Sequence, residues 1–308
     1  MAFHYSTVET GGQKLDILTD DHAGLRIAVS RIGAELISIS RRNEAGEWVG
    51  FLHRDGEVEK PASGWGNHAT VMGYFLHRLK GEKSNYLGHE ICGGNHSFLR
   101  SKHFPAPEHH DENSLTYRLE PDQIAPHEYP FKVGFQLTYE LVGDTLRINF
   151  VFHNYEDHDC HVSFGLHPGF AVTSIADAEL KMAAGRYVRL FAPGNFLSGE
   201  TETIDFPGGD MPFDKEKLPD SYLLDLSGVH LPLFVLADPA THKVLYLNFS
   251  GVPYATIWSD GGPFICVEPC WGMPDHHEQR PFEQKLGIQT IAACGHLTRS
   301  FSISPQFQ

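Results

Sequence analysis

The sequence predicts an all-β protein, a large antiparallel β-sandwich formed by a single domain over residues 1–308. Helical apolar periodicity never persists for three or four turns, whereas short segments of alternating apolar and polar residues are frequent. Turn residues such as Gly11-Gly12 and Gly261-Gly262-Pro263 recur between these segments. Many short strands with such spacing are typical of a sandwich or barrel. No linker, composition break or internal repeat divides the chain, which is too long for an immunoglobulin-sized sandwich, so we expect large sheets.

Individual strands are predicted from alternation and from the turn residues that bound them. The segments predicted as strands are 25–30, 33–40, 131–141, 145–154, 162–166, 231–237, 244–249, 255–258, 264–267, 287–292 and 297–303. The last two are expected to pair with each other. Residues 194–222 are rich in Gly, Pro and acidic residues, and we expect them to form a long loop over one sheet.

Composition and charge exclude several classes of partner. The chain has 24 Lys and Arg against 39 Asp and Glu, a formal net charge of −15, so a nucleic-acid partner is not expected. No run approaches the roughly 18 apolar residues of a membrane span, and residues 1–20 do not resemble a secretory signal. Five scattered cysteines without a C-x-x-C pair indicate free thiols in a reducing compartment. We therefore expect a cytoplasmic protein, and nothing indicates a particular oligomeric state.

The segment FICVEPCWGMPD, residues 264–275, is the one around which we expect the chain to be organised. Glu268 follows four residues of a buried strand, and Pro269 removes a backbone donor and is expected to end that strand. Trp271 could then offer a ring on which a sugar stacks. Taken alone, these residues are explained more simply by a strand that ends in a turn.

Two further segments contain candidate catalytic or binding side chains. Arg78 and His96 flank an expected hairpin whose turn lies in residues 85–90. His167, in FGLHPGF, is expected at a strand end because Pro168 and Gly169 follow it. Individually, each has a structural explanation, such as a histidine bonded to a backbone carbonyl or a surface arginine. Together, a carboxylate, imidazoles and a guanidinium on a β scaffold suit acid–base chemistry on a neutral polyol.

Metal binding is not expected, although the chain has 20 histidines. Residues 109–112 (HHDE) and 275–278 (DHHE) have the composition of a metal site. Adjacent histidines on an extended segment point to opposite sides, so neither tetrapeptide chelates naturally, and we expect both to be solvated loops. Cys266 and Cys270 flank Glu268, but we expect them to be buried packing residues.

Four motifs in order, RLK at 78–80, HSFLR at 96–100, HPGF at 167–170 and IxxEPxxG at 265–272, resemble the aldose 1-epimerase (galactose mutarotase) family. The resemblance is strongest to its divergent LacX-like branch and extends over nearly the whole chain. It implies the galactose mutarotase-like supersandwich fold, which agrees with the strand pattern. This chain departs from the branch where glycine commonly precedes the arginine (His77), where glycine commonly follows the first histidine (Ser97), and where tryptophan commonly follows Glu-Pro (Cys270).

The resemblance also implies an activity, the interconversion of α and β anomers of a free aldose, with no cofactor. Glu268 would be the general base and His167 the general acid, and the expected charge states are an ionised Glu268 and a protonated His167. His96, Arg78 and Asp220 would bind the sugar. The alternatives are a hexose-6-phosphate 1-epimerase, a non-catalytic carbohydrate-binding or sensing protein on the same fold, and a metal-dependent β-sandwich enzyme.

Overall fold

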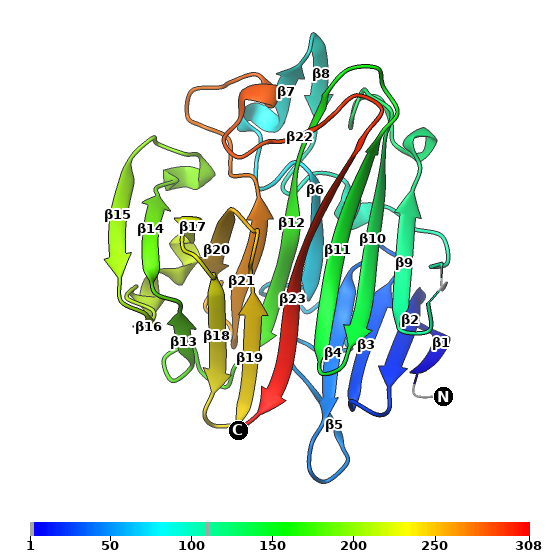
Figure 1. The fold of residues 1–308 in the computed structure, drawn as a ribbon, viewed down its shortest axis with the longest axis vertical. Coiled ribbons are helices and arrows are strands. Elements are labelled where there is room, and N and C mark those ends of the chain that lie inside the picture. Colours follow the sequence, from blue (N-terminus) through cyan, green and yellow to red (C-terminus); the bar gives the residue numbers. More distant parts are fainter. Residues whose placement is uncertain (1–2, 109–110) are drawn as a thin grey trace.

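The protein is formed almost entirely of antiparallel strands. The structure, a computed structural model, describes residues 3–108 and 111–308. The strands form a five-stranded sheet, two large sheets of eight strands each and a two-stranded hairpin. Figure 1 shows the long strands of both large sheets running roughly along the vertical axis, with the five-stranded sheet at the lower right beside the N-terminus. The prediction of an all-β antiparallel sandwich is therefore confirmed.

The five-stranded sheet has the order β1 (Phe3–Thr10), β2 (Gln13–Asp20), β3 (Leu25–Ser30), β4 (Leu36–Arg42), β5 (Trp48–Gly50). The first large sheet has the order β16 (Gly209–Asp210), β13 (Glu179–Met182), β18 (Leu233–Asp238), β19 (Lys243–Asn248), β23 (His296–Phe307), β11 (Thr145–Asn154), β10 (Val133–Val142), β9 (Ser114–Leu119).

The second large sheet has the order β15 (Thr201–Phe206), β14 (Gly185–Leu190), β17 (Tyr222–Gly228), β20 (Tyr254–Trp258), β21 (Phe264–Trp271), β12 (Cys160–Ala171), β22 (Gln289–Ile291), with β6 (Ala69–Tyr74) also paired to β12. The hairpin is β7 (Lys83–Tyr86) and β8 (His89–Cys92). The helices are short 3-10 turns, η1 (Lys80–Glu82), η2 (Leu99–Ser101), η3 (Pro121–Gln123), η4 (Pro193–Asn195), η5 (Lys215–Asp220) and η6 (Phe282–Gln284).

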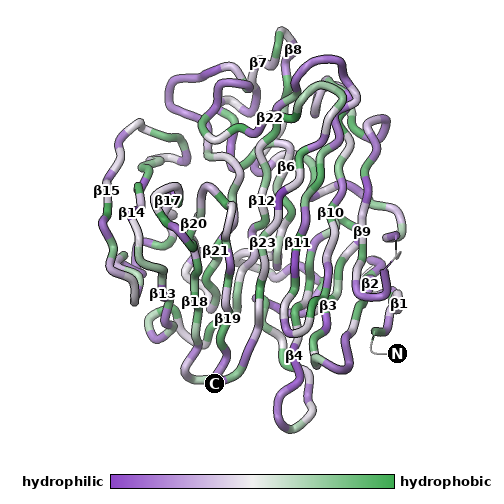
Figure 2. Tube along the Cα trace, viewed as in Figure 1, coloured by the Kyte–Doolittle hydropathy of each residue, from purple (hydrophilic) through white to green (hydrophobic). Residues whose placement is uncertain are grey.

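The two large sheets share an aromatic core. Phe150 and Phe152 of β11 face Phe164 of β12, with ring centroids 5.3 and 4.6 Å apart, and Phe164 stacks on Trp271 of β21 at 5.1 Å. Burial of apolar surface at this interface is the main force that holds the layers together. Figure 2 shows the same division along the chain, with hydrophobic residues recurring in the central strands and hydrophilic ones in outer elements such as β15.

The strand predictions are confirmed where alternation is regular. Residues 25–30 and 145–154 are β3 and β11, and the turn within 85–90 joins β7 to β8. Three predictions are wrong. Segment 194–222 contains β15, β16 and two 3-10 turns; β22 pairs with β12 and is not a hairpin partner of β23; and β12 and β21 do not end at their prolines. The HHDE tetrapeptide begins with His109 and His110, which lie outside the described residues.

Candidate active site

The centre of the second large sheet contains an interruption between β12 and β21. Backbone pairing joins Gly165 to Cys270 and Gly169 to Cys266, but the three residues between these points on each strand have no partner in the ladder. Pro168 and Pro269 lie in the interruption, where each removes one backbone donor. The prolines therefore open the ladder locally instead of ending the strands, and both strands continue beyond them.

His167 and Glu268 face each other across this interruption. The register places them directly opposite, and His167 Nε2 lies 3.4 Å from Glu268 Oε1. Thr256 of β20 is paired with Glu268, Leu223 of β17 with Thr256, and Thr70 of β6 with His167. These five side chains form one row across five strands, and all five line the same cavity of about 350 Å³. A cavity of this size falls in the range of small-molecule sites.

Segments that are distant in sequence complete the cavity. His96, Arg78 and Asp220 all line it, so the structure brings together five of the six residues singled out from the sequence. Asp220 stands at the end of η5, in the segment expected to be a loop. The imidazole of His96 is perpendicular to that of His167, with centroids 5.4 Å apart.

Trp271 is the exception. Its side chain is fully buried in the core between the sheets and does not line the cavity, and its indole N–H donates to the Gly251 carbonyl at 3.3 Å. Because β21 continues through Pro269, residues 268 and 271 project from opposite faces of the sheet. The expected sugar-stacking role of Trp271 does not fit this structure.

Trp65 and Trp258 supply the aromatic walls instead. Trp65 stacks on His167, with centroids 5.0 Å apart and planes 24° apart, and Trp258 meets His167 edge-on at 5.5 Å. The approach of Trp65 requires Gly169, since a Cβ at that position would lie 2.3 Å from Trp65 Cζ3. Trp65 lies in an irregular segment with no sequence motif, so nothing in the sequence pointed to it.

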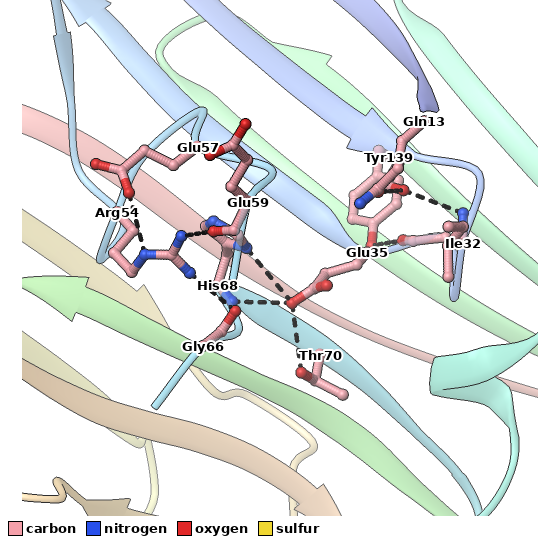
Figure 3. Close-up of polar contacts among 12 residues, drawn as sticks. Gln13, Ile32, Glu35, Arg54, Glu57, Glu59, Gly66, His68, Thr70 and Tyr139 are labelled. Atoms are coloured by element: carbon pink, nitrogen blue, oxygen red, sulfur yellow. Dashed lines mark hydrogen bonds and ion pairs between the residues drawn. The ribbon is translucent and has the colours of Figure 1, made fainter. Parts of the chain in front are cut away.

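Polar contacts of Arg54 and Glu35 hold the segment that carries Trp65. Arg54 contacts the Glu57 carboxylate and the carbonyls of Glu59 and Gly66. Glu35 accepts the backbone N–H of His68 at 2.8 Å (Figure 3). Asp260 also accepts the backbone N–H of Trp65 at 2.7 Å. The indole is therefore positioned from both sides before any ligand binds.

Backbone contacts fix the orientation of His96. The His77 N–H donates to His96 Nδ1 at 3.2 Å, and the His96 N–H donates to the His77 carbonyl at 2.7 Å. With Nδ1 accepting, the neutral ring carries its proton on Nε2 and can donate it to a ligand. His96 and Ser97 both have φ of 61°, in the left-handed region. Ser97 thus adopts the strained conformation that glycine tolerates at the place where the related branch commonly has glycine.

A buried ion pair anchors the segment of Arg78. Asp275 Oδ1 lies 2.6 Å from Lys285 Nζ, with both side chains almost fully buried. Asp275 Oδ2 accepts the Lys80 N–H at 3.0 Å, and the Asp275 N–H donates to the Arg78 carbonyl. In the DHHE segment, which was expected to be solvated, Asp275 is therefore a structural residue, whereas His277 and Glu278 are exposed.

Burial dominates the electrostatics of the His167–Glu268 pair. It lowers the pKa of His167 to about 3 and raises the pKa of Glu268 well above its usual range. Burial likewise lowers the pKa of His96, and that of His77 to about 4. His167 is therefore neutral at neutral pH, and burial favours the protonated form of Glu268. The expectation of a protonated His167 is therefore wrong, and burial opposes the expected ionised form of Glu268, because the charged forms lose more hydration than their contact returns.

Two further features, one in the cavity and one that extends from its floor to the buried Cys266, were not singled out from the sequence. Arg100, half-buried at the end of HSFLR, lines the cavity beside Arg78. Neither guanidinium forms an ion pair in the part of the chain that the structure describes. The other feature is a group of side chains with metal-ligand chemistry, formed by His167, Cys266 and Glu268.

Comparison with known proteins agrees with this geometry. The aldose 1-epimerase family model matches residues 16–277, which is most of the chain. The chain belongs to the aldose 1-epimerase family. No curated protein sequence matches it. Within the described residues, no helix has the length and apolar character needed to cross a membrane.

Solved structures share the fold of this family member. A galactose mutarotase related enzyme from Lactobacillus acidophilus has a TM-score of 0.82 at 22% identity, covering 98% of this chain and 97% of that one. A galactose mutarotase-like protein from Lactobacillus casei has a TM-score of 0.80 at 20% identity, covering 98% and 100%. Galactose 1-epimerase from Lactobacillus acidophilus has a TM-score of 0.72 at 14% identity, covering 99% and 98%. These likenesses establish the fold.

Proposed function

We propose that the protein interconverts the α and β anomers of a free aldose by general acid–base ring opening and closure. The observation that carries the proposal is the His167–Glu268 pair. A carboxyl group and an imidazole oppose each other at 3.4 Å on the floor of a sugar-sized cavity, at the one place where the ladder between β12 and β21 is open. Both groups are nearly inaccessible except from the cavity.

Anomer exchange needs one proton removed and one delivered, so the pair needs only one proton in total. In the direction that the family implies, Glu268 takes the proton of the C1 hydroxyl while His167 gives a proton to the ring oxygen. The bond between C1 and the ring oxygen breaks, and C1 becomes an aldehyde. Rotation about C1–C2 and the reverse transfers then close the ring on its other face.

The buried environment favours the ring-opened stage of this cycle. After ring opening, Glu268 is a neutral acid and His167 a neutral base, which is the charge state that burial favours. The charged starting pair must therefore be stabilised by the bound sugar, whose hydroxyls can donate to the second Glu268 oxygen. That oxygen, Oε2, is buried and has no hydrogen-bond partner among the described residues. If the sugar stabilises the charged pair while its ring opens, the site binds the transition state more tightly than the ground state, and this difference accelerates the reaction.

The remaining polar groups are suited to hold the sugar. His96 Nε2 and the Arg78 guanidinium are donors, the Asp220 carboxylate is an acceptor, and Trp65 offers an apolar face above His167. Such a mixture of an aromatic face and convergent polar groups is typical of carbohydrate sites.

Polarimetry on freshly dissolved α-glucose and α-galactose tests the proposal. Replacing Glu268 with Gln or His167 with Asn removes one proton-transfer group, so we expect kcat to fall about 10²–10⁴-fold. Glu202→Gln, at an exposed position on β15, is the matched control and should keep the wild-type rate. Full anomer exchange in either active-site variant would refute the assignment. Sugar binding by NMR without faster exchange in the wild type would identify a non-catalytic carbohydrate-binding protein.

A second candidate function, 1-epimerisation of a hexose 6-phosphate, is favoured by Arg78 and Arg100. Both arginines line the cavity and have no ion-pair partner among residues 3–108 and 111–308, and guanidinium is well suited to phosphate. Comparing kcat/KM for glucose and glucose 6-phosphate distinguishes the two functions. If the phosphate ester is the substrate, its kcat/KM should exceed that of glucose, and Arg100→Gln should remove this preference. A preference for the free sugar in the wild type excludes this candidate.

A further inference from the structure

The alternation of β21 gives the catalytic carboxyl group a buried thiol as a neighbour. Residues 266, 268 and 270 project from one face of the strand, so Cys266 lies one row beyond Glu268 on the cavity side of the sheet. One ligand atom each from His167, Cys266 and Glu268 lies within 4.8 Å of the other two, and all three residues are buried. Imidazole nitrogen, thiolate sulfur and carboxylate oxygen are the ligands that Zn²⁺ takes in proteins.

The spacing of the pair fits a tetrahedral cation. Zinc bonds of about 2.0–2.2 Å to nitrogen and oxygen set a nitrogen–oxygen edge of about 3.3 Å in a tetrahedral site. His167 Nε2 and Glu268 Oε1 are 3.4 Å apart. A Zn–S bond of about 2.3 Å requires edges of about 3.6 Å to the sulfur, and the Cys266 atom already lies within 4.8 Å. A small side-chain adjustment of Cys266 completes three ligands.

Unpartnered atoms in this group favour an added cation. Glu268 Oε2 and His167 Nδ1 are both buried without a hydrogen-bond partner among the described residues. A carboxylate bound to a cation regains the charge stabilisation that burial removed. Within the described part of the chain, however, no carboxylate or carbonyl accepts a hydrogen bond from His167 Nδ1 in the way that usually orients a ligand histidine. This absence favours reversible binding over a permanently held metal.

We propose that His167, Cys266 and Glu268 form a binding site for a borderline-soft divalent cation such as Zn²⁺, with the fourth position open to the sugar cavity, and that the bound cation inhibits the enzyme. Binding releases the thiol proton and the carboxyl proton to solvent, while neutral His167 supplies its Nε2 lone pair. The cation then occupies the lone pairs that proton transfer requires. The inhibition rests on the proposed epimerase function; the binding does not.

Co²⁺ provides a spectroscopic test of the binding. Metal-free wild-type protein is titrated with Co²⁺, and the visible d–d bands and the thiolate charge-transfer band are recorded. Cys266→Ser and Cys266→Ala remove the sulfur ligand. Cys270→Ser is the matched control, since Cys270 is equally buried on the same face of the same strand but has its sulfur 3.7 Å from Thr256 Oγ1 and is not in the ligand group.

The wild type and Cys270→Ser should give the thiolate band with one equivalent of Co²⁺, and both Cys266 variants should lack it. Competition with a chromophoric chelator should show Zn²⁺ affinity at least about 10-fold lower in the Cys266 variants. Thermal melts show whether each variant is folded, and a folded Cys266→Ala that keeps the thiolate band would overturn the proposal. Equal Zn²⁺ affinity in all four proteins would also overturn it, because the metal would then be bound by surface histidines.

Inhibition is measured as anomer exchange relative to the metal-free rate of each protein. Zn²⁺ should inhibit the wild type and Cys270→Ser, with at least about 10-fold more Zn²⁺ needed for the Cys266 variants. Mg²⁺ should have no effect, since it prefers oxygen ligands. Binding without inhibition would refute the inhibitory part. If the protein has no epimerase activity, the proposed function fails, whereas the Co²⁺ spectra still decide the metal site.

Discussion

The ladder between β10 and β11 and the ladder between β12 and β21 are built from strands of similar length but serve different purposes. The first has ten consecutive backbone pairs, from Val133 with Asn154 to Val142 with Thr145. The second loses its pairing over three residues on each strand, around His167 and Glu268. The buried side chains of β10 are hydrophobic, and the hydroxyl of Tyr139 donates to the Ala34 carbonyl at 2.8 Å, whereas the interruption buries two ionisable residues, His167 and Glu268.

The difference places the apolar pairing that stabilises the fold and the site of the proposed chemistry in separate parts of one sandwich. Regular pairing and apolar burial stabilise the fold, and neither requires a polar group in the interior. The interruption instead buries polar groups, namely a carboxyl group and an imidazole whose Oε2 and Nδ1 atoms have no hydrogen-bond partner among the described residues. Such features destabilise a fold unless another element compensates, and they are characteristic of active sites.

The largest expected effect is a loss of stability on substituting Phe152 of β11, in the regularly paired part of the sandwich. Phe152→Ala removes a ring that contacts Phe164 at 4.6 Å, Phe135 at 5.1 Å and Tyr74 at 5.2 Å. The cavity it leaves should lower the free energy of unfolding by about 3–5 kcal/mol, measured by urea denaturation. Anomer exchange per folded molecule should stay close to wild type at low temperature. A large loss of that rate would mean that the two regions are not separable.

Glu268→Gln should increase the free energy of unfolding at neutral pH, whereas Phe152→Ala should lower it. Burial raises the pKa of Glu268 above its usual 4.5, so the folded state holds a proton that the unfolded chain releases as pH rises. The contribution of this group to stability is therefore present below pH 4.5 and is lost as pH rises towards the folded-state pKa, by roughly 1.4 kcal/mol for each pH unit. Gln does not ionise, so the variant should be more stable than wild type at pH 7.5 and similar at pH 4.5. Urea denaturation at both pH values tests this, and lower stability at pH 7.5 would contradict it.

Gly169→Ala should weaken sugar binding with little effect elsewhere. The new methyl group would displace Trp65 from its stacked position on His167. Loss of an aromatic contact of about 0.5–1.5 kcal/mol should raise KM roughly 2- to 12-fold. Gly134→Ala, on β10, is the control, because its nearest added contact is an ordinary 3.4 Å from Tyr155 Cε2. Equal effects of the two substitutions would show that Trp65 does not contribute.

The smallest expected effect is that of moderate acid on catalysis. Because the pKa of His167 is about 3, its imidazole stays neutral while Glu268 is protonated until the pH falls far below 6.5. After burial, His77 and Arg100 lower the pKa of His167 further, whereas a backbone hydrogen bond raises it. We expect kcat/KM to stay nearly constant from pH 7 to pH 5 and to fall in base as Glu268 loses the only proton. A tenfold loss between pH 7.5 and 5.5, corrected for spontaneous exchange, would contradict the buried neutral pair.

Regular alternation made much of the fold predictable. Both ends of β11 follow from its sequence because its apolar residues recur at every second position. The continuation of β12 through Pro168 and of β21 through Pro269 could not be predicted, because it depends on the ladder between these two strands being open at both prolines while each strand stays paired on its other side. The position of the open stretch is set by how the two strands pair, and the sequence of either strand alone does not reveal it.

The same limit explains which site residues were found. His167 and Glu268 lie in motifs that resemble a family, whereas Trp65 and Arg100 enter the cavity only through the way the sheets and loops fold around it. The error on Trp271 follows directly from ending β21 too early. With the strand extended, its odd spacing from Glu268 assigns it to the core face.

The row of side chains on the cavity floor has a consequence for folding kinetics. Its members span positions 70 to 268, and each comes from a different strand. Contacts between residues so far apart in sequence form late in folding, because loop closure must precede them. During refolding, anomer exchange should therefore recover later than the β-sheet circular dichroism signal. The rate of anomer exchange would then measure the completion of the second large sheet.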